Sequence, residues 1–494
     1  MSRTTPPAHP APGARHEPPG PVAVDDLLAG LPAPRQVSAD QVASATAGGP
    51  CLVVLDDDPT GTQTVADIPV LTTWRVDDLR WALRQPANAF FVLTNTRSLS
   101  SVDAAARNRE VAGALAEAAA AEGVSYVLAS RSDSTLRGHY PLETDVLAEE
   151  EARHGRPVDG VVISPAYLQA GRLTVGSVHW MRTPAGMIPV ASSEFAEDAT
   201  FGYRNSDLRA WVAEKTAGRV PAAQVLAITL ADLRTGGPEH VAELLGTLRG
   251  GRPAVVDAVD DTDLRVLALA LVRAEAAGTR LVYRVGPSFV RARSGQAEQP
   301  PLTPERLRGI GDPERAGRHG LVAVGSHVGL TTRQLAGLRE LGGIAEFELD
   351  VPTLLDPAAR AGHIAELARA AAAAMADTDV VLRTSRTLVT GDDPDASLSI
   401  ARAVSSALVA AVAATVRDTR PAWVVAKGGI TSSDIATDSL GIRRAIARGT
   451  LLPGIVSLWE PVAGPFTGTP YVVFAGNVGD DDSLARVVTT LRSR

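Results

Sequence analysis

Three consecutive carboxylates, Asp56, Asp57 and Asp58, interrupt an apolar run in the stretch CLVVLDDDPTGTQTV at residues 51–65. Carboxylates this close repel one another, which raises their pKa values unless a cation, a ligand hydroxyl or backbone N–H groups compensate. Asp, Pro and Gly also form turns, so a plain turn is the alternative interpretation. Because the apolar run is typical of a strand, the triad indicates a ligand site at a strand end.

Three further stretches place Arg and hydroxyl side chains directly after apolar runs. They are LTNTRSLS (93–100), ASRSDSTLRGHYPLE (129–143) and SPAYLQAGRLTVGSVHW (164–180). Arg suits bidentate capture of a carboxylate, and Asp or Ser suits sugar hydroxyls, although a helix N-cap with solvated arginines is the alternative for the second stretch. The candidate substrate-binding residues are Asp56, Asn95, Arg97, Arg131, Asp133, Ser134, Arg137 and Arg172.

The second half of the chain carries glycine loops after its apolar runs, in VAVGSH, VAKGGITSSD and FAGNVGDD. Gly lets the backbone approach a phosphate, and the N–H groups that follow stabilise its charge. Gly is common in the turns of every α/β protein, so a single loop of this kind indicates little. The prediction of a phosphate site rests on three such loops in one half of the chain. The middle loop holds Lys427, and of 48 basic residues only Lys215 and Lys427 are lysines. No G-x-x-x-x-G-K-[ST] motif occurs, so a P-loop is not predicted.

Composition limits the class of protein. A chain of 494 residues with a 45% hydrophobic share is too long for one core and can fill two. The net charge of −8, without blocks of like charge, argues against nucleic acid and anionic membranes as partners. The single cysteine, Cys51, excludes an intramolecular disulfide and a Cys-based zinc site. Without an uninterrupted apolar run of membrane length or a signal-peptide pattern, we expect a cytoplasmic protein.

Short apolar runs alternate with amphipathic segments, which predicts parallel sheets covered by helices on both faces. The predicted fold class is α/β, with two α/β domains of mainly parallel sheet and an active-site cleft between them. We predict a disordered Pro-rich tail over 1–22, an N-terminal domain over 23–290, a linker over 291–320 and a C-terminal domain over 321–494. The predicted strands are 51–55, 89–94, 124–129, 160–164, 224–230, 253–259 and 280–286, then 321–327, 345–351, 379–385, 422–429 and 470–482.

Taken together, the motifs resemble the four-carbon acid sugar kinases, which phosphorylate threonate, erythronate and 3-oxo-tetronate type substrates with ATP. The resemblance covers nearly everything after residue 50, and its marks include LDDDPTGTQTV, SRSDSTLRGHYPLE, SSEFAEDATFGY, VGSHVGLTTRQL and KGGITSSD. It implies a sugar-binding N-terminal domain and a nucleotide-binding C-terminal domain. By the same resemblance, Asp57 and Asp58 fall on the catalytic aspartate pair. The nucleotide contacts that it implies are Ser326, Gly428, Gly429, Ile430, Thr431 and Gly476.

Two departures from the family pattern affect the nucleotide loops. The family often has Gly-Gly-Glu-Thr-Ser where this chain has GGITS, and Lys-Ser-Gly-Asn-Phe-Gly where this chain has FAGNVG. An acidic residue and a Lys are therefore absent from their usual places. We include Lys427 among the nucleotide-binding residues, as a replacement for the missing positive charge.

The resemblance implies phosphoryl transfer from ATP with Mg²⁺, in which the protein aligns the acceptor hydroxyl and neutralises developing charge. Asp57 would accept the hydroxyl proton or hold that hydroxyl in line. Asp58 and Asp56 would orient the substrate or a magnesium-bound water, and the metal ligands themselves are not predicted. Arg97, Arg131 and Arg137 would hold the substrate carboxylate. The expected partner is a small sugar acid, and a homodimer is considered for the assembly.

Two other functions fit parts of the sequence. VVLDDDPTGT also fits the hydrophobic-D-x-D-x-T pattern of haloacid-dehalogenase-like phosphatases, with Asp56 as nucleophile, Asp58 as acid and Lys427 as charge clamp. That function would spread one site over two domains and leave the Arg-rich loops unused. The second alternative is a non-catalytic sensor that binds a sugar acid between its domains.

Overall fold

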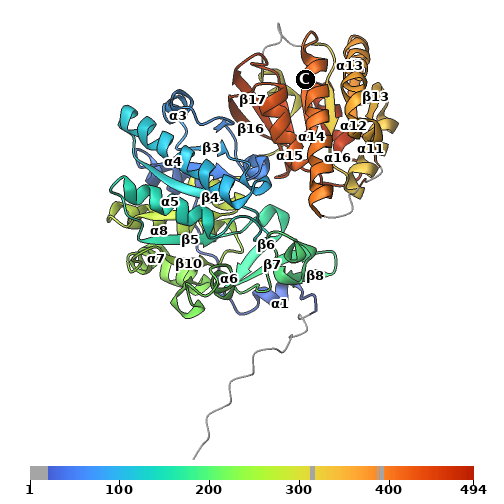
Figure 1. Cartoon of the computed structure of the whole chain (residues 1–494). Helices are drawn as coiled ribbons and strands as arrows, with labels where there is room; N and C mark the ends of the chain where they lie inside the picture. Colours follow the sequence, from blue (N-terminus) through green and yellow to red (C-terminus); the bar gives the residue numbers. More distant parts are fainter. Residues whose placement is uncertain (1–19, 312–316, 387–388, 390–393) are drawn as a thin grey trace, which may run out of the picture.

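The computed structural model describes residues 20–311, 317–386, 389 and 394–494 (Figure 1). Its described strands form a 15-stranded sheet that runs through both halves of the chain and a separate three-stranded sheet. The order in the large sheet is β13-β14-β12-β15-β18-β17-β16-β2-β3-β1-β4-β11-β5-β10-β9. The predicted fold class, a mainly parallel α/β arrangement in two domains, is confirmed.

The N-terminal half contributes eight parallel strands to the large sheet. These are β1 (Cys51–Asp56), β2 (Ile68–Leu71), β3 (Ala89–Leu93), β4 (Tyr126–Arg131), β5 (Gly160–Ser164), β9 (Leu226–Ile228), β10 (Arg252–Val256) and β11 (Leu281–Val285). All six residues of β1 are buried, as expected for a strand covered on both faces.

Helices cover both faces of this half, as the alternating pattern predicts. One face packs against α3 (Val76–Leu83), α4 (Ser101–Glu122) and α5 (Leu142–Arg153). The other face packs against α2 (Ala39–Thr46), α7 (Gly237–Leu245), α8 (Asp261–Ala276) and α9 (Pro287–Arg293). The short α1 (Val24–Leu28), α6 (Leu208–Lys215) and the small sheet of β6 (Arg172–Val175), β7 (Val178–Thr183) and β8 (Gly186–Pro189) complete the half.

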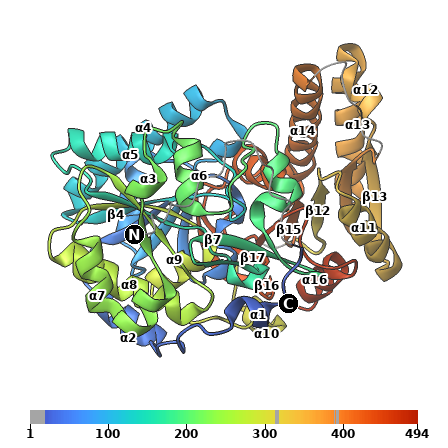
Figure 2. The same cartoon turned by 90° about the horizontal axis from the view of Figure 1, so that it is seen from below.

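The C-terminal half contributes a second parallel group and an antiparallel pair. The parallel strands are β12 (Leu321–Val324), β13 (Ile344–Leu349), β14 (Asp379–Thr384), β15 (Val424–Lys427) and β18 (Tyr471–Phe474). The antiparallel pair is β16 (Arg444–Leu452) and β17 (Val456–Ala463). On one face lie α10 (Pro304–Arg308), α11 (Gly329–Leu341) and α16 (Ser483–Arg492), and on the other α12 (Val351–Leu355), α13 (Pro357–Ala374), α14 (Pro394–Val416) and α15 (Gly429–Asp434) (Figure 2).

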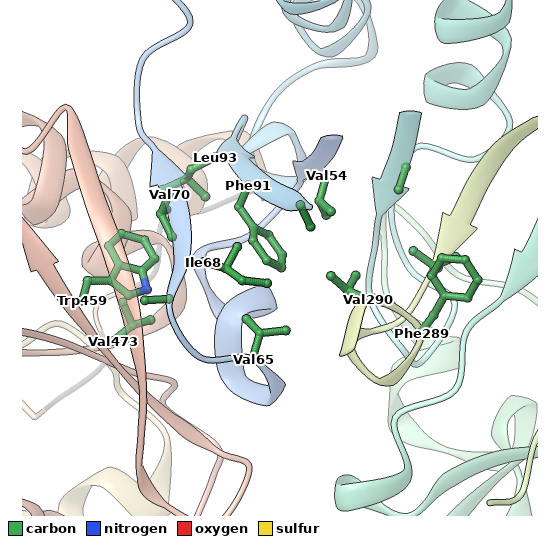
Figure 3. Close-up of a cluster of buried hydrophobic side chains, with 14 of the residues drawn as sticks. Val54, Val65, Ile68, Val70, Phe91, Leu93, Phe289, Val290, Trp459 and Val473 are labelled. Carbon is green, nitrogen blue, oxygen red and sulfur yellow. The ribbon is translucent and has the colours of Figure 1, made fainter. Parts of the chain in front are cut away.

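The two halves join through backbone pairing between β2 and β16, which run antiparallel. The apolar core continues across this junction, where Ile68 and Val70 of β2 and Trp459 of β17 belong to the same buried cluster (Figure 3). Sequence reasoning missed β2, the β6–β8 sheet and the β16–β17 pair. The four residues of β2 are too few to show a period of their own, and the buried positions at the start of β16 hold Ala445, Ala447 and Gly449, residue types that are depleted in strands.

The segment predicted as a linker, 291–320, is ordered at both described ends. Arg291 and Arg293 of α9 are buried in the N-terminal half, where they form ion pairs with Asp261 and Glu275. Leu302 and Leu307 belong to the core of the C-terminal half, while residues 312–316 lie outside the described residues.

The predicted disordered tail over 1–22 falls mostly on residues 1–19, which also lie outside the described residues. Residues 20–22 are described, and Val22 exchanges backbone hydrogen bonds of 2.9 and 2.8 Å with Met187 at the edge of β8. The ordered N-terminal structure therefore begins before residue 23.

One helix of the described residues, α14, contains an 18-residue stretch, Ser399–Val416, that is long and apolar enough to cross a membrane by length and composition alone. In the fold, α14 packs against α12, α13 and β14, with Leu408 and Val412 fully buried. Of this stretch, 44% is buried inside the fold.

Asp78 on α3 reinforces the junction with a buried charge. The carboxylate is fully buried and pairs with Arg443 at 2.9 Å and Arg444 at 2.6 Å, both from the C-terminal half. We predict that Asp78→Asn lowers the free energy of unfolding by about 3 kcal/mol at neutral pH, because two guanidinium groups lose their partner. Urea unfolding measures the change.

A matched control crosses the same junction at the surface, where Asp67, 60% exposed, pairs with Arg448. Asp67→Asn should cost less than about 1 kcal/mol, since water screens exposed pairs. The pKa of Asp78 is lowered by hydrogen bonds from Thr73, Arg444 and Arg443, against the opposing effect of burial. Its contribution should therefore persist above about pH 4 and disappear as the pH falls further.

Equal losses of unfolding free energy in Asp78→Asn and Asp67→Asn would contradict the prediction.

Candidate active site

A cavity of about 670 Å³ lies between the two halves, at the carboxyl ends of the parallel strands. β1, β3, β4 and β5 lead into it from the N-terminal half, and β12, β15 and β18 from the C-terminal half. Strand ends of a parallel sheet collect the loops that bind ligands, as the sequence interpretation assumed. The predicted residues that line the cavity are Asp57, Asp58, Asn95, Arg97, Arg131, Asp133, Ser134, Arg137, Arg172, Ser326, Gly428, Gly429, Thr431 and Gly476.

Two predicted residues with described side chains are not among the residues that line this cavity: Asp56 and Lys427. The side chain of Ile430 lies outside the described residues. Asp56 is 2% exposed and sits below the cavity, where its carboxylate lies 2.9 Å from Nε of Arg131. Burial raises the pKa of Asp56 to about 8, although the Arg131 charge opposes the rise. The expected contact of Asp56 with the substrate is corrected to a contact with Arg131.

Asp57 is held by arginines on both of its carboxylate oxygens. Arg97 binds it in a bidentate manner, with Nη2 2.5 Å from Oδ1 and Nε 3.0 Å from Oδ2. Arg131 approaches Oδ1 at 3.4 Å, and Asp57 is only 1% exposed. Bidentate Arg–carboxylate pairs are strong and geometrically fixed. Asp57 therefore fixes the position of Arg97.

Asp58 has the freer carboxylate of the pair. Its Oδ1 accepts a hydrogen bond of 2.8 Å from the N–H of Thr60, and its Oδ2 lies 3.3 Å from Nη1 of Arg97. A side chain on Gly429 would come within 3.1 Å of Oδ2, so this carboxylate reaches the glycine loop of the other half. Arg97, Arg131 and Thr60 lower the pKa of Asp58 against the opposing effect of burial, and it is charged at neutral pH.

The residues that follow the aspartate triad do form a turn, and this turn also contacts the C-terminal half. Residues Pro59–Thr64 form a 3₁₀ helix, η1, in which all but Thr60 are buried. The segment docks on the C-terminal half, where Trp459 donates to Thr62 and the side chain of Gln63 donates to the carbonyl of Ile455. The turn therefore links the aspartates to the opposite half.

The arginines around the cavity are not equivalent. Arg137 is paired with Asp133 at 2.7 Å and lies over the ring of Phe195. Arg172, at the start of β6, forms no ion pair within the described part of the chain, and its Nε has no hydrogen-bond partner there. Burial lowers the pKa of Arg172, although the Asp133 charge opposes this. A half-buried guanidinium without a partner, lining a cavity, suits an incoming anion.

Sequence reasoning missed several residues at the site. Glu143 is 4% exposed and accepts hydrogen bonds from Thr96 and Ser130. Burial and the Asp57 charge raise the pKa of Glu143 to about 7. The missed residues that line the cavity include Thr60, Gln63, Tyr167, Phe195, Asp198 and Phe201. Most of them lie inside the quoted motifs, so the signal was present, but neither residue type nor spacing distinguished them from their neighbours.

The glycines of the second half are required by close contacts. A Cβ on Gly325 would lie 2.4 Å from Oγ1 of Thr431, and a Cβ on Gly476 would lie 2.3 Å from Oγ of Ser326. Gly428 has φ +136°, which other residues rarely adopt. Backbone from three loops thus comes together at the cavity, a surface that suits phosphate groups.

Lys427 ends β15 below these loops and is fully buried. Its Nζ donates a hydrogen bond of 3.0 Å to the carbonyl of Ala475 and lies 3.7 Å from the ring centroid of Phe474. Burial lowers the pKa of Lys427 to about 7. The expected direct contact with the nucleotide is corrected, because the amine lies under the loop and does not line the cavity.

The described residues contain no group of three or more His, Cys, Asp or Glu side chains arranged to hold a metal ion. This does not conflict with Mg²⁺ chemistry, because Mg²⁺ is commonly bound through one or two carboxylates together with substrate phosphates. The cavity offers carboxylates for this purpose, because Asp58, Asp133 and Asp198 all line it.

Comparison with known proteins assigns the two halves. Residues 52–293 match a family described as a sugar-binding N-terminal domain, and residues 321–484 match one described as a nucleotide-binding C-terminal domain. The chain belongs to the four-carbon acid sugar kinase family. The cavity therefore lies between the sugar-binding and the nucleotide-binding domain of a member of this family.

A curated relative is the D-threonate kinase of Bordetella bronchiseptica, which is 28% identical over 459 residues, covering 90% of this chain and 99% of the relative. The fold is shared with a crystal structure of a Haemophilus influenzae protein, with 20% identity, a TM-score of 0.59 and coverage of 89% of this chain and 100% of that one. A Salmonella typhimurium LT2 protein named as a tRNA synthase gives 19% identity, a TM-score of 0.62 and coverage of 88% and 98%. At these identities the two structures show the fold alone.

We predict that Gly476→Ala weakens binding of ADP by at least about tenfold, because the added Cβ clashes with Ser326 and displaces the loop. Isothermal titration calorimetry measures the affinity. The control is Gly362→Ala on α13, where the added Cβ meets nothing within 4 Å. That control should leave the ADP affinity unchanged, and Gly476→Ala with wild-type affinity would contradict the steric argument.

Proposed function

We propose that this protein transfers a phosphoryl group from ATP to a hydroxyl of a four-carbon sugar acid of the threonate, erythronate or 3-oxo-tetronate type. The observation that carries the proposal is the position of Asp58, which belongs to the sugar-binding domain yet reaches Gly429 of the nucleotide-binding domain. A hydroxyl held by this carboxylate would face a phosphate held by the glycine loops. The relative named as a D-threonate kinase supports the same chemistry.

Recognition of the acid end of the substrate is assigned to Arg172. Its guanidinium lines the cavity and has no internal counter-ion among the described residues, whereas Arg97 and Arg137 are already paired with Asp57 and Asp133. A substrate carboxylate would supply the missing partner of Arg172. The nearby polar side chains of Asn95 and Ser134 line the same cavity and suit sugar hydroxyls.

The roles of the two aspartates follow from their surroundings. The sequence interpretation gave the proton-accepting role to Asp57, but both oxygens of Asp57 are engaged by Arg97. Asp58 offers Oδ2 to the cavity, with only a 3.3 Å contact to Arg97. We therefore assign alignment and deprotonation of the acceptor hydroxyl to Asp58, and positioning of Arg97 to Asp57. Arg97 then supplies positive charge beside the reaction centre.

ATP with Mg²⁺ supplies the phosphoryl group and neutralises charge on the phosphates. The chain's own contribution on this side is the backbone of the loops at Ser326, Gly428 and Gly476, which can approach phosphate oxygens closely. Enclosure between two domains limits the access of water, which competes with the sugar hydroxyl as acceptor.

The phosphatase alternative needs Asp56 as an exposed nucleophile. Asp56 is 2% exposed, is paired with Arg131 and does not line the cavity. The proposed clamp, Lys427, is buried in the other half. These positions count against the phosphatase. The sensor alternative differs from the kinase in that a sensor binds the sugar acid without turning over ATP. The cytoplasmic location and the homodimer stay predictions from the sequence.

The first test is release of ADP from MgATP in the presence of each of several four-carbon sugar acids, alongside release of phosphate from phosphate esters without nucleotide. Substrate-dependent ADP release supports the kinase. Phosphate release from esters alone would support the phosphatase, and saturable binding of an acid without any turnover would support the sensor.

We predict that Asp58→Asn lowers kcat by at least about a hundredfold, because general base and alignment effects are of this size. The matched variant Asp57→Asn removes the same charge from a carboxylate that lies behind Arg97. It should lower kcat less, because Arg97 keeps its charge beside the reaction centre and loses only its anchor. Steady-state kinetics with both substrates varied measure the difference, and the reverse ranking would restore Asp57 as the base.

We predict that Arg172→Gln raises the KM for the sugar acid by about tenfold to a hundredfold, because a charge-assisted hydrogen bond is lost. The KM for ATP should change by less than about twofold. Arg182 offers a control on the adjacent strand, β7, because it does not line the cavity. Arg182→Gln should leave both constants near wild type, and equal effects of the two variants would refute the assignment.

A further inference from the structure

Lys427 is a buried amine that the proposed reaction leaves without a task. Its side chain is fully buried, and of its three potential donors one has an acceptor in the described part of the chain, the carbonyl oxygen of Ala475. No described carboxylate forms an ion pair with it, although the ring face of Phe474 lies 3.7 Å from Nζ. Burial of an unpaired cation is costly, so the arrangement needs a compensating benefit.

The acceptor of this hydrogen bond belongs to a peptide at the cavity wall. Ala475 and Gly476 both line the cavity, whereas Lys427 does not. In a planar trans peptide, the carbonyl and the following N–H point in opposite directions. Because the carbonyl of Ala475 points to the buried amine, the N–H of Gly476 points away from it. In the described part of the chain, no group accepts a hydrogen bond from that N–H.

The next peptide is held in a similar way. Oγ1 of Thr331 on α11 lies 3.0 Å from the carbonyl oxygen of Gly476 and donates to it. The same hydroxyl lies 3.1 Å from Oγ of Ser326. Both peptides that flank Gly476 are therefore fixed by side chains, and Gly476 itself has no room for a Cβ beside Ser326.

We propose that Lys427 is a positioning residue that fixes the Ala475–Gly476 peptide with its N–H directed at a phosphate of the bound nucleotide. The inference rests on the proposed function, because it assigns a nucleotide phosphate to this side of the cavity. When protonated, the amine also places a positive charge directly behind that peptide. In a poorly solvated site, this charge attracts the phosphate more strongly than an exposed lysine would.

The charge of Lys427 depends on pH in the neutral range. Burial lowers the pKa of the Lys427 amine to about 7. The titratable groups on the neighbouring elements are His327 after β12, Asp434 at the end of α15 and Asp480 after β18, and none contributes a resolved shift to Lys427. A phosphate nearby favours the charged amine, so nucleotide binding should take up a proton above about pH 7 and weaken as the pH rises.

The test compares Lys427→Met with Lys215→Met in the full-length protein. Lys215 is the other lysine of the chain and also donates to backbone carbonyls, those of Phe201 and Gly202 in the sugar-binding domain. Lys427→Met should raise the Kd for ATP and the KM for ATP by about tenfold, and leave the KM for the sugar acid within about twofold. Lys215→Met should leave the Kd for ATP unchanged.

A pH series provides a readout that a purely structural role would not affect. Between about pH 6 and pH 9, the wild-type Kd for ATP should rise more steeply than that of Lys427→Met, so the two values converge. If Lys427→Met does not fold, Lys427→Gln keeps an N–H donor without the charge. It should bind ATP with a flatter pH dependence than the wild type.

The outcomes separate the two proposals. If the wild type phosphorylates a sugar acid and the Lys427 variants keep its Kd for ATP over the whole pH range, the positioning role is overturned while the kinase stands. An equal loss of ATP affinity in Lys215→Met would also overturn it. If the wild type neither binds ATP nor releases ADP with any sugar acid, the proposed function fails and the inference fails with it.

Discussion

The antiparallel pairing of β2 with β16 is the constraint on which the rest of the structure depends. It joins two parallel sheets into one, and it is reinforced by Asp78 with two arginines and by η1 docking on β17. Because the sheet is continuous, the carboxyl ends of strands from both halves meet at one cavity. The position of Asp58 relative to Gly429 is a consequence of that junction.

The charges at the cavity form an interlocked set in which most groups hold one another. Asp56 holds Arg131, Asp57 holds Arg97 and Asp133 holds Arg137. Two groups keep a free face, the Oδ2 side of Asp58 and the guanidinium of Arg172. A substrate with a hydroxyl and a carboxylate would satisfy both, and the paired groups would keep their positions while it binds. Such preorganisation reduces the reorganisation needed at the moment of reaction.

On the side of the nucleotide-binding domain the cavity is lined by the backbone of glycine loops, whereas on the side of the sugar-binding domain it is lined by charged side chains. Glycines allow close approach of the loops, and buried side chains such as Lys427 and Thr331 orient the peptides from below. A buried amine is costly to the fold, and the cost is acceptable where it fixes the direction of an N–H group. The departures of the glycine loops from the family pattern are thus accompanied by a positive charge that lies under the loop and not in the cavity.

The sequence by itself determined the α/β class and the main parallel strands, and most of its candidate site residues lie at the cavity, because strand ends followed by Asp, Arg and Gly have a local signature. It could not determine that Asp56 and Lys427 are buried, because each is the last residue of its strand and only the tertiary structure decides where the covered strand ends and the cavity begins. Nor could it reveal the β2–β16 pairing, which joins residues far apart in the chain. The different tasks proposed for Asp57 and Asp58 depend on the position of Arg97 relative to their carboxylates, and only the tertiary structure decides that position.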